Sequence, residues 1–153
     1  ENVKEEAIQA GINGFLTKPI FKADILERLK QYIQGGYQED EEQQIRESDN
    51  LEGVRILVAD DNELNLEIMF EIFNSSGAAV DCAHNGKEAL EAYLKSSQGY
   101  YQIILMDVHM PEMNGLEATK EIRNSGRPDA CTVPIIAMTA YLRKIYAGAR
   151  TQE

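Results

Sequence analysis

Cysteine is scarce in this sequence: the two residues present, Cys82 and Cys131, are far apart and form no CxxC pair. Isolated thiols do not make a zinc cluster, and we expect both to be free thiols packed in apolar surroundings, in a reducing compartment. The two histidines, His84 and His109, also lack the spacing of metal ligands. The sequence therefore predicts neither a disulfide framework nor a cysteine or histidine metal site.

Basic residues and long apolar runs are few as well. The 153 residues carry 15 Lys and Arg against 26 Asp and Glu, a net charge of −11, with no basic stripe or aromatic ladder. This composition argues against direct binding to nucleic acid or to an anionic membrane. Because no apolar run reaches membrane-spanning length and no signal segment opens the chain, we expect a soluble, cytoplasmic protein.

The length suits one ordinary domain. Because the chain begins with Glu1 inside an expected helix, we expect it to be part of a longer protein.

Beyond residue 50 the chain alternates between short apolar runs and amphipathic stretches. The expected elements are strands and helices in turn, at residues 54–59, 63–74, 79–83, 87–95, 103–106, 116–124 and 133–138. Such alternation predicts right-handed βαβ units around a parallel sheet. In the helix at 63–74 we expect one core-facing side, formed by Leu64, Ile68, Ile72 and Phe73.

The first 33 residues carry a separate pattern. A helix ends at Gly11, a brief buried strand follows at 14–17, and an amphipathic helix ends near Ile33. Residues 34–50 are too acidic and too poor in apolar side chains to pack, which predicts a solvated linker. At the other end, residues 141–153 form a tail that we expect to be helical or disordered.

Three carboxylates end two of the expected strands. Asp60 and Asp61 follow the first strand beyond the linker, and Asp107 follows the apolar run at 103–106. In parallel neighbours these acids meet at the carboxyl edge of the sheet, where like charges raise each other's pKa unless a cation intervenes. A set of oxygen ligands favours a hard ion such as Mg²⁺. The alternative is that the acids and Asn62 only cap the next helix, which leaves Asp107 unexplained.

Four segments together resemble the receiver domain of two-component response regulators, most closely the receivers of hybrid sensor histidine kinases. They are VADDN at 58–62, MDVHMPEMNG at 106–115, PIIAMTA at 134–140 and GFLTKPI at 14–20. The resemblance implies a flavodoxin-like α/β fold, a doubly wound parallel sheet of five strands in the order 2-1-3-4-5. It implies two partners, a histidine kinase domain and a histidine phosphotransfer protein, and a hybrid histidine kinase as the parent.

The order of the segments departs from that family, because the Lys-Pro strand precedes all the others. Two interpretations remain open. Residues 1–33 are the C-terminal part of one receiver and 51–140 the N-terminal part of the next, or the chain is a circularly permuted receiver. In both, the N-terminal segment supplies the fifth strand, either within one chain or by exchange between two copies in a homodimer.

The resemblance also implies roles for the acids. Asp107 becomes the phosphoacceptor, taking a phosphoryl group from phosphohistidine. Asp60, Asp61 and Asp107 bind Mg²⁺ together with the backbone carbonyl of His109, whose imidazole has no catalytic part.

Three further residues receive roles by the same resemblance. Thr139 and Lys18 contact the phosphoryl oxygens, and Thr139 and Phe15 change position together as a switch. Each has a plainer interpretation: Thr139 as a β-branched strand residue, Lys18 as a solvated strand end, and Phe15 as ordinary core.

Two other functions remain open. An aspartate-nucleophile phosphatase uses similar chemistry, but such enzymes place a second acid two residues after the nucleophile, where this chain has His109. A receiver-like interaction module that is not phosphorylated is the other possibility, and the intact set of three acids argues against it.

Overall fold

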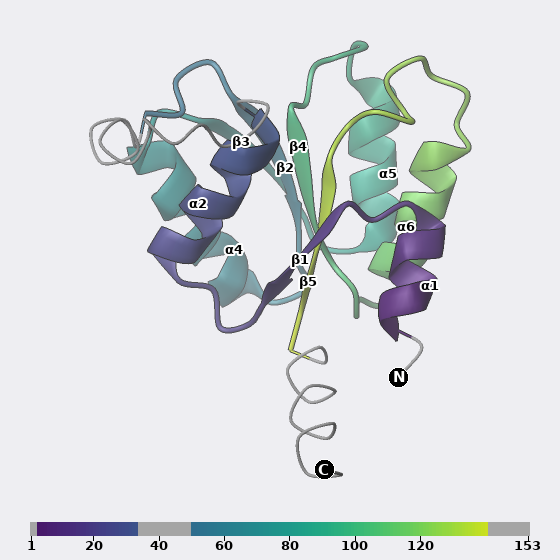
Figure 1. The fold of residues 1–153 in the computed structure, drawn as a ribbon, viewed down its shortest axis with the longest axis horizontal. Helices are drawn as coiled ribbons and strands as arrows, with labels where there is room; N and C mark the ends of the chain where they lie inside the picture. The colour runs from purple at the N-terminus through teal and green to yellow at the C-terminus, as the bar shows by residue number, and fades with distance from the viewer. Residues whose placement is uncertain (1–2, 34–49, 141–153) are drawn as a thin grey trace, which may run out of the picture.

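A computed structural model describes residues 3–33 and 50–140 of the chain. At its centre is one parallel sheet of five strands in the order β1-β5-β4-β2-β3 (Figure 1). The strands are β1 (Gly14–Thr17), β2 (Arg55–Ala59), β3 (Ala79–Ala83), β4 (Ile103–Asp107) and β5 (Ile135–Thr139). Read from β3 to β1, the sheet has the predicted order 2-1-3-4-5 with the N-terminal strand as the fifth, so the predicted fold is confirmed.

Helices cover both faces of the sheet (Figure 1). They are α1 (Val3–Ala10), α2 (Lys22–Ile33), α4 (Glu63–Ser75), α5 (Gly86–Lys95) and α6 (Gly115–Arg123). One apolar cluster joins the sheet to α1, α5 and α6, and a second joins its other face to α2 and α4. Because β2, β4 and β5 are buried on both faces, they read as continuous apolar runs in the sequence. Among the described helices, none combines the length and the apolar character needed to cross a bilayer.

The N-terminal segment completes the sheet. Strand β1 runs parallel to β5, with Gly14 opposite Ile136 and Thr17 opposite Thr139. Helix α2 follows and buries three apolar side chains against the second cluster, those of Ile25, Leu26 and Leu29. The structure thus shows the fifth strand supplied within one chain.

Arg123 also links this segment to the rest of the domain by hydrogen bonds. The Arg123 guanidinium, at the end of α6, donates to the carbonyl of Gly11 from Nε at 3.1 Å and from Nη2 at 2.7 Å. It also donates to Asn13 Oδ1 at 2.7 Å, and to the Ala130 and Val133 carbonyls at 2.9 and 2.7 Å. One side chain therefore holds the α1–β1 turn against the loop that leads into β5.

The predicted core face of α4 is confirmed for Phe73 and Ile72 and wrong for Leu64 and Ile68. Leu64 and Ile68 are 62% and 41% exposed, whereas Leu66, Met69 and Phe73 are buried. Apolar residues occupy nearly every side of this helix, so their spacing cannot select the inward face. Asn62, in the loop after β2, caps the helix by accepting the backbone N–H groups of Leu64 and Asn65.

The predicted packing of the two cysteines is also wrong, because both Cys82 and Cys131 are exposed. Cys82 lies on β3, an edge strand with most of its side chains open to solvent, and Cys131 lies in the loop before β5. They are free thiols, as expected. The predicted linker, apart from residue 50, and the predicted tail at 141–153 lie outside the described residues.

Candidate functional site

The carboxyl ends of β1, β2, β4 and β5 lie at one edge of the sheet, the lower edge in Figure 1. Asp60 and Asp61 follow β2 there, and Asp107 is the last residue of β4. One carboxylate oxygen from each of the three lies within 4.8 Å of the others. Asp60 and Asp107 are buried, and Asp61 is exposed. The parallel sheet therefore brings together the acids that the sequence placed at strand ends.

Lys18 joins this cluster from the N-terminal segment. Its Nζ lies 3.1 Å from Asp60 Oδ2 and 3.1 Å from Asp107 Oδ2. Its backbone N–H donates to the Thr139 carbonyl at 3.3 Å, which holds the residue at the end of β5. Burial of the ammonium acts to lower the pKa of Lys18, but the charges and hydrogen bonds of Asp107 and Asp60 outweigh it and raise the pKa.

The Asp107 carboxyl is hard to ionise in this setting. Burial is the largest cause that raises its pKa, to about 6, and the charge of Asp60 adds to it. The Lys18 ammonium and the backbone N–H of His109, 3.4 Å from Asp107 Oδ1, act in the opposite direction. The Lys18 ammonium therefore does not offset the desolvation of the Asp107 carboxylate, and a further cation would favour its ionised form.

This shift predicts how stability depends on pH without a divalent cation. Because the folded-state pKa of Asp107 lies above its ordinary 3.8, the folded chain binds the extra proton, and ionisation costs stability as pH rises from 3.8 to about 6. We expect Asp107→Asn to gain up to roughly 3 kcal/mol over the wild type across that interval and to keep the gain above it. Urea unfolding of both proteins at several pH values measures the difference. If the difference in unfolding free energy between the two proteins does not vary with pH, Asp107 ionises normally.

The donor set fits a hard divalent cation. The three side chains that converge offer carboxylate oxygens alone, two of them from buried groups, and this is the chemistry that Mg²⁺ prefers. A shallow hollow of about 500 Å³ lies beside them, lined by Asp61, His109, Met110, Pro111 and Asn114. The cluster is thus open on one side to a ligand that also contacts an ion.

The loop after Asp107 is held tightly in place. Gly115 donates its backbone N–H to the Val108 carbonyl at 3.0 Å, and Gly86 donates to the Met113 carbonyl at 2.9 Å. A Cβ on Gly115 would collide with the Asp107 carbonyl, and one on Gly86 with that of Met113. Gly115 therefore allows backbone to pass closely beside Asp107, and Gly86 allows close contact with the far end of the loop that carries His109. The His109 side chain itself is exposed.

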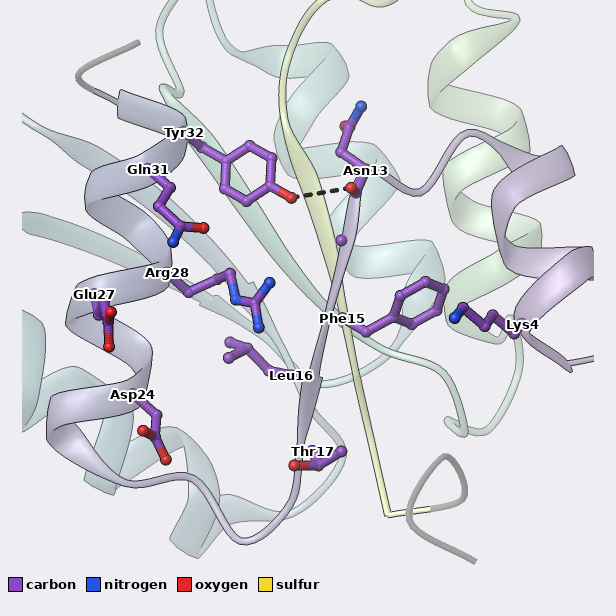
Figure 2. A pocket seen from close by; sticks show the side chains of 11 residues that line it. Lys4, Asn13, Phe15, Leu16, Thr17, Asp24, Glu27, Arg28, Gln31 and Tyr32 are labelled. Atoms are coloured by element: carbon purple, nitrogen blue, oxygen red, sulfur yellow. Dashed lines mark hydrogen bonds between the residues drawn. The ribbon is translucent and has the colours of Figure 1, made fainter. Parts of the chain in front are cut away.

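The two predicted switch residues lie on neighbouring strands. Thr139 ends β5 and is 1% exposed. Phe15 lies on β1, half-buried against the apolar cluster on the α1 side, and its ring points toward Lys4 of α1 (Figure 2). Their positions are compatible with a joint movement, but a switch stays a prediction.

The sequence does not single out Asn65, which lies in the first turn of α4. Its side-chain Nδ2 lies 3.3 Å from Asp60 Oδ2. The feature of the sequence that could have identified Asn65 is the spacing DDNxxN at 60–65, which puts an amide side chain one helical turn beyond a capping residue.

A larger groove, of about 600 Å³, lies along the open side of β1 between α1 and α2 (Figure 2). It has a mixed lining, with Lys4 on one side and Asp24 and Arg28 on the other, and Tyr32 donates to the Asn13 carbonyl across its end at 2.9 Å. None of the three clustered carboxylates contributes to its walls. The groove is therefore separate from the acidic site.

Comparison with known proteins gives a consistent result. Residues 56–152 match the family described as the response regulator receiver domain. A probable histidine kinase 1 from Oryza sativa subsp. indica is 43% identical over 83 residues, which are 52% of this chain and 8% of that protein. In seven histidine kinases that it matches, the chain spans between 4% and 11% of the relative's length.

Solved structures agree. The receiver domain of a sensor histidine kinase from Pseudomonas aeruginosa PAO1 is 33% identical, with a TM-score of 0.50 over 56% of this chain and 66% of that one. That structure has a magnesium ion coordinated in its active site cleft. The receiver domain of the Francisella response regulator 1452 is 27% identical, with a TM-score of 0.51 over 61% of this chain and 74% of that one.

Proposed function

This chain belongs to the receiver domain family of two-component response regulators, and from that premise we propose that Asp107 accepts a phosphoryl group from a phosphohistidine. The observation that carries the proposal is the placement of Asp107. It is buried at the end of β4, within 4.8 Å of two further carboxylates and 3.1 Å from the Lys18 ammonium. Such a site concentrates both a nucleophile and the groups that neutralise charge.

In the proposed reaction a carboxylate oxygen of Asp107 attacks the phosphorus atom. A P–O bond forms, the P–N bond to the donor imidazole breaks, and the imidazole nitrogen keeps the electron pair and takes up a proton. Asp107 needs no general base, because its ionised form is already a nucleophile. The product is an acyl phosphate on Asp107.

The remaining site residues have supporting roles in this proposal. Asp60 and Asp61 hold Mg²⁺ with Asp107 and the His109 carbonyl; when bound, the ion neutralises charge on the carboxylates and on the phosphoryl oxygens. Lys18 and the Thr139 hydroxyl stabilise the phosphoryl group, and Thr139 and Phe15 are the proposed switch.

The proposed context is a phosphorelay within a hybrid histidine kinase. A histidine kinase domain is the donor, and a histidine phosphotransfer protein is a second partner. Residues 1–33 correspond to the C-terminal strand and helix of a receiver, and residues 51–140 to its first four strands. Their pairing within one chain, at β1 and β5, supports a site shared by the two segments. Exchange of the segment between two copies would build the same site in a homodimer.

Substitution of Lys18 tests whether the N-terminal segment serves the site. We expect Lys18→Ala to slow phosphorylation by acetyl phosphate about 100-fold, because a charge that stabilises the phosphoryl oxygens is lost. Its Mg²⁺ affinity should rise several-fold, since the ammonium that lies against Asp60 and Asp107 no longer competes with the ion. Phosphate incorporation and calorimetric titration measure the two effects.

Lys22→Ala is the matched control, because Lys22 is exposed at the start of α2 and should leave both quantities unchanged. Normal labelling of Lys18→Ala would show that the shared site does not operate.

A further inference from the structure

Asn65 has a position that the proposed chemistry does not yet use. It lies half-buried in the first turn of α4, and its Nδ2 donates to Asp60 Oδ2 at 3.3 Å. The same oxygen lies 3.1 Å from Lys18 Nζ. An uncharged amide and a charged ammonium therefore share one oxygen of a carboxylate that is 0% exposed.

This contact closes a ring of hydrogen bonds around the end of β2. Asp60 Oδ1 accepts the backbone N–H of Asn62 at 2.9 Å. Asn62 Oδ1 in turn accepts the backbone N–H of Asn65 at 3.4 Å, as the cap of α4. The Asn65 side chain then returns to Asp60 Oδ2. The start of α4 therefore contacts both oxygens of Asp60: the backbone N–H of its N-cap holds Oδ1, and the Asn65 side chain holds Oδ2.

A bound cation would act differently on Lys18 and Asn65, the two partners of Asp60 Oδ2. Lys18 carries a positive charge, and a divalent ion among Asp60, Asp61 and Asp107 would repel it. The Asn65 amide is neutral, so it can keep its hydrogen bond whether an ammonium or a metal ion neutralises the cluster. Asn65 is thus suited to hold Asp60 in one orientation in both conditions.

We propose that Asn65 is a positioning residue that orients the Asp60 carboxylate for a divalent cation. The inference rests on the proposed function, since it concerns the same cation site. Partners of this kind commonly contribute 10- to 100-fold to metal affinity, because a ligand free to rotate must be ordered when the ion binds. Loss of the amide also leaves Lys18 as the sole described side-chain partner of Asp60 Oδ2, which favours the ammonium over the ion.

Substitutions that separate the amide from the bulk of the side chain test this role. Asn65→Leu keeps a similar volume without a donor, and we expect about 10-fold weaker Mg²⁺ binding by calorimetric titration. Asn65→Gln keeps the donor and should stay within about threefold of the wild type. Asn74→Leu, at an exposed position on the same helix, should bind as the wild type does. Circular dichroism before titration checks that each variant is folded.

A second measurement needs no metal ion. In the metal-free wild type, the Asn65 side-chain amide protons should exchange slowly with solvent and shift in NMR spectra when Lys18 is replaced by alanine, because both groups contact Asp60 Oδ2. Asn74 amide protons should not shift.

The outcomes separate this inference from the proposed function. If the wild type binds Mg²⁺ and Asn65→Leu binds it equally well, the positioning role is wrong and the proposed function stands. If Asn65→Leu and Asn65→Gln lose affinity equally, the amide is not what matters, and the inference is again overturned. If the wild type binds no Mg²⁺, or if Asp107→Asn binds it unchanged, the proposed function is wrong, whatever the Asn65 variants do.

Discussion

Asp107→Asn is expected to abolish phosphorylation of the chain by acetyl phosphate in the presence of Mg²⁺. The side-chain amide has nearly the shape of the carboxylate but is a poor nucleophile, so no acyl phosphate should form. The fold should persist, because the substitution removes a buried charge whose pKa burial has raised to about 6. Intact-protein mass spectrometry after incubation measures the incorporation directly.

The matched control is Asp24→Asn, at an exposed position in the first turn of α2. It should be labelled like the wild type. Equal labelling of Asp107→Asn and the wild type would place the acceptor elsewhere. Hydrolysis of a phosphomonoester that depends on Asp107, with continuing turnover, would favour the aspartate-nucleophile phosphatase instead.

Arg123→Met should be the most destabilising of these substitutions, with a loss of about 3 kcal/mol in the free energy of unfolding. The variant keeps most of the side-chain volume but removes the donors to the carbonyls of Gly11, Ala130 and Val133. These carbonyls lie between the N-terminal segment and the loop before β5, where water must replace the guanidinium. Urea unfolding followed by circular dichroism measures the change.

Arg28→Met, on α2 at the rim of the groove beside β1, is the control and should change stability little. If Arg123→Met has the same free energy of unfolding as the wild type, the guanidinium does not stabilise the N-terminal segment. If instead it lowers stability, slows phosphorylation and raises Mg²⁺ affinity, as expected for Lys18→Ala, the segment that carries Lys18 is held to the site through this arginine.

Much of the fold follows from local patterns in the sequence. The strand β4, for example, is an apolar run bounded by a carboxylate, and its neighbours in the sheet are runs of the same kind. Runs buried on both faces belong to parallel sheets, and parallel strands place their carboxyl ends at one edge. The meeting of Asp60 with Asp107 therefore follows from strand order rather than from any single motif.

Other features depend on tertiary geometry that local patterns do not carry. The apolar residues of α4 cover most of its circumference, so their spacing leaves the inward face ambiguous, and Leu66 and Met69 replace the expected Leu64 and Ile68. The exposure of Cys82 follows from the edge position of β3, which only the assembled sheet defines.

Local sequence patterns also do not predict contacts between segments that are far apart in the chain. Arg123 and Gly11 are 112 residues apart in the chain, and their hydrogen bonds appear only when α1 packs beside α6. Lys18 is different, because the resemblance of its segment to a family motif predicted its place at the site although it lies 89 positions from Asp107 in the chain.

The most direct test of the central claim locates the phosphoryl group chemically. The chain is incubated with acetyl phosphate and Mg²⁺, the acyl phosphate is reduced with borohydride, and the peptides are mapped by tandem mass spectrometry. We predict one modified residue, Asp107, and no modification when Mg²⁺ is omitted. Modification at a different residue, or none with donor and Mg²⁺ present, would contradict the proposal that Asp107 is the phosphoacceptor.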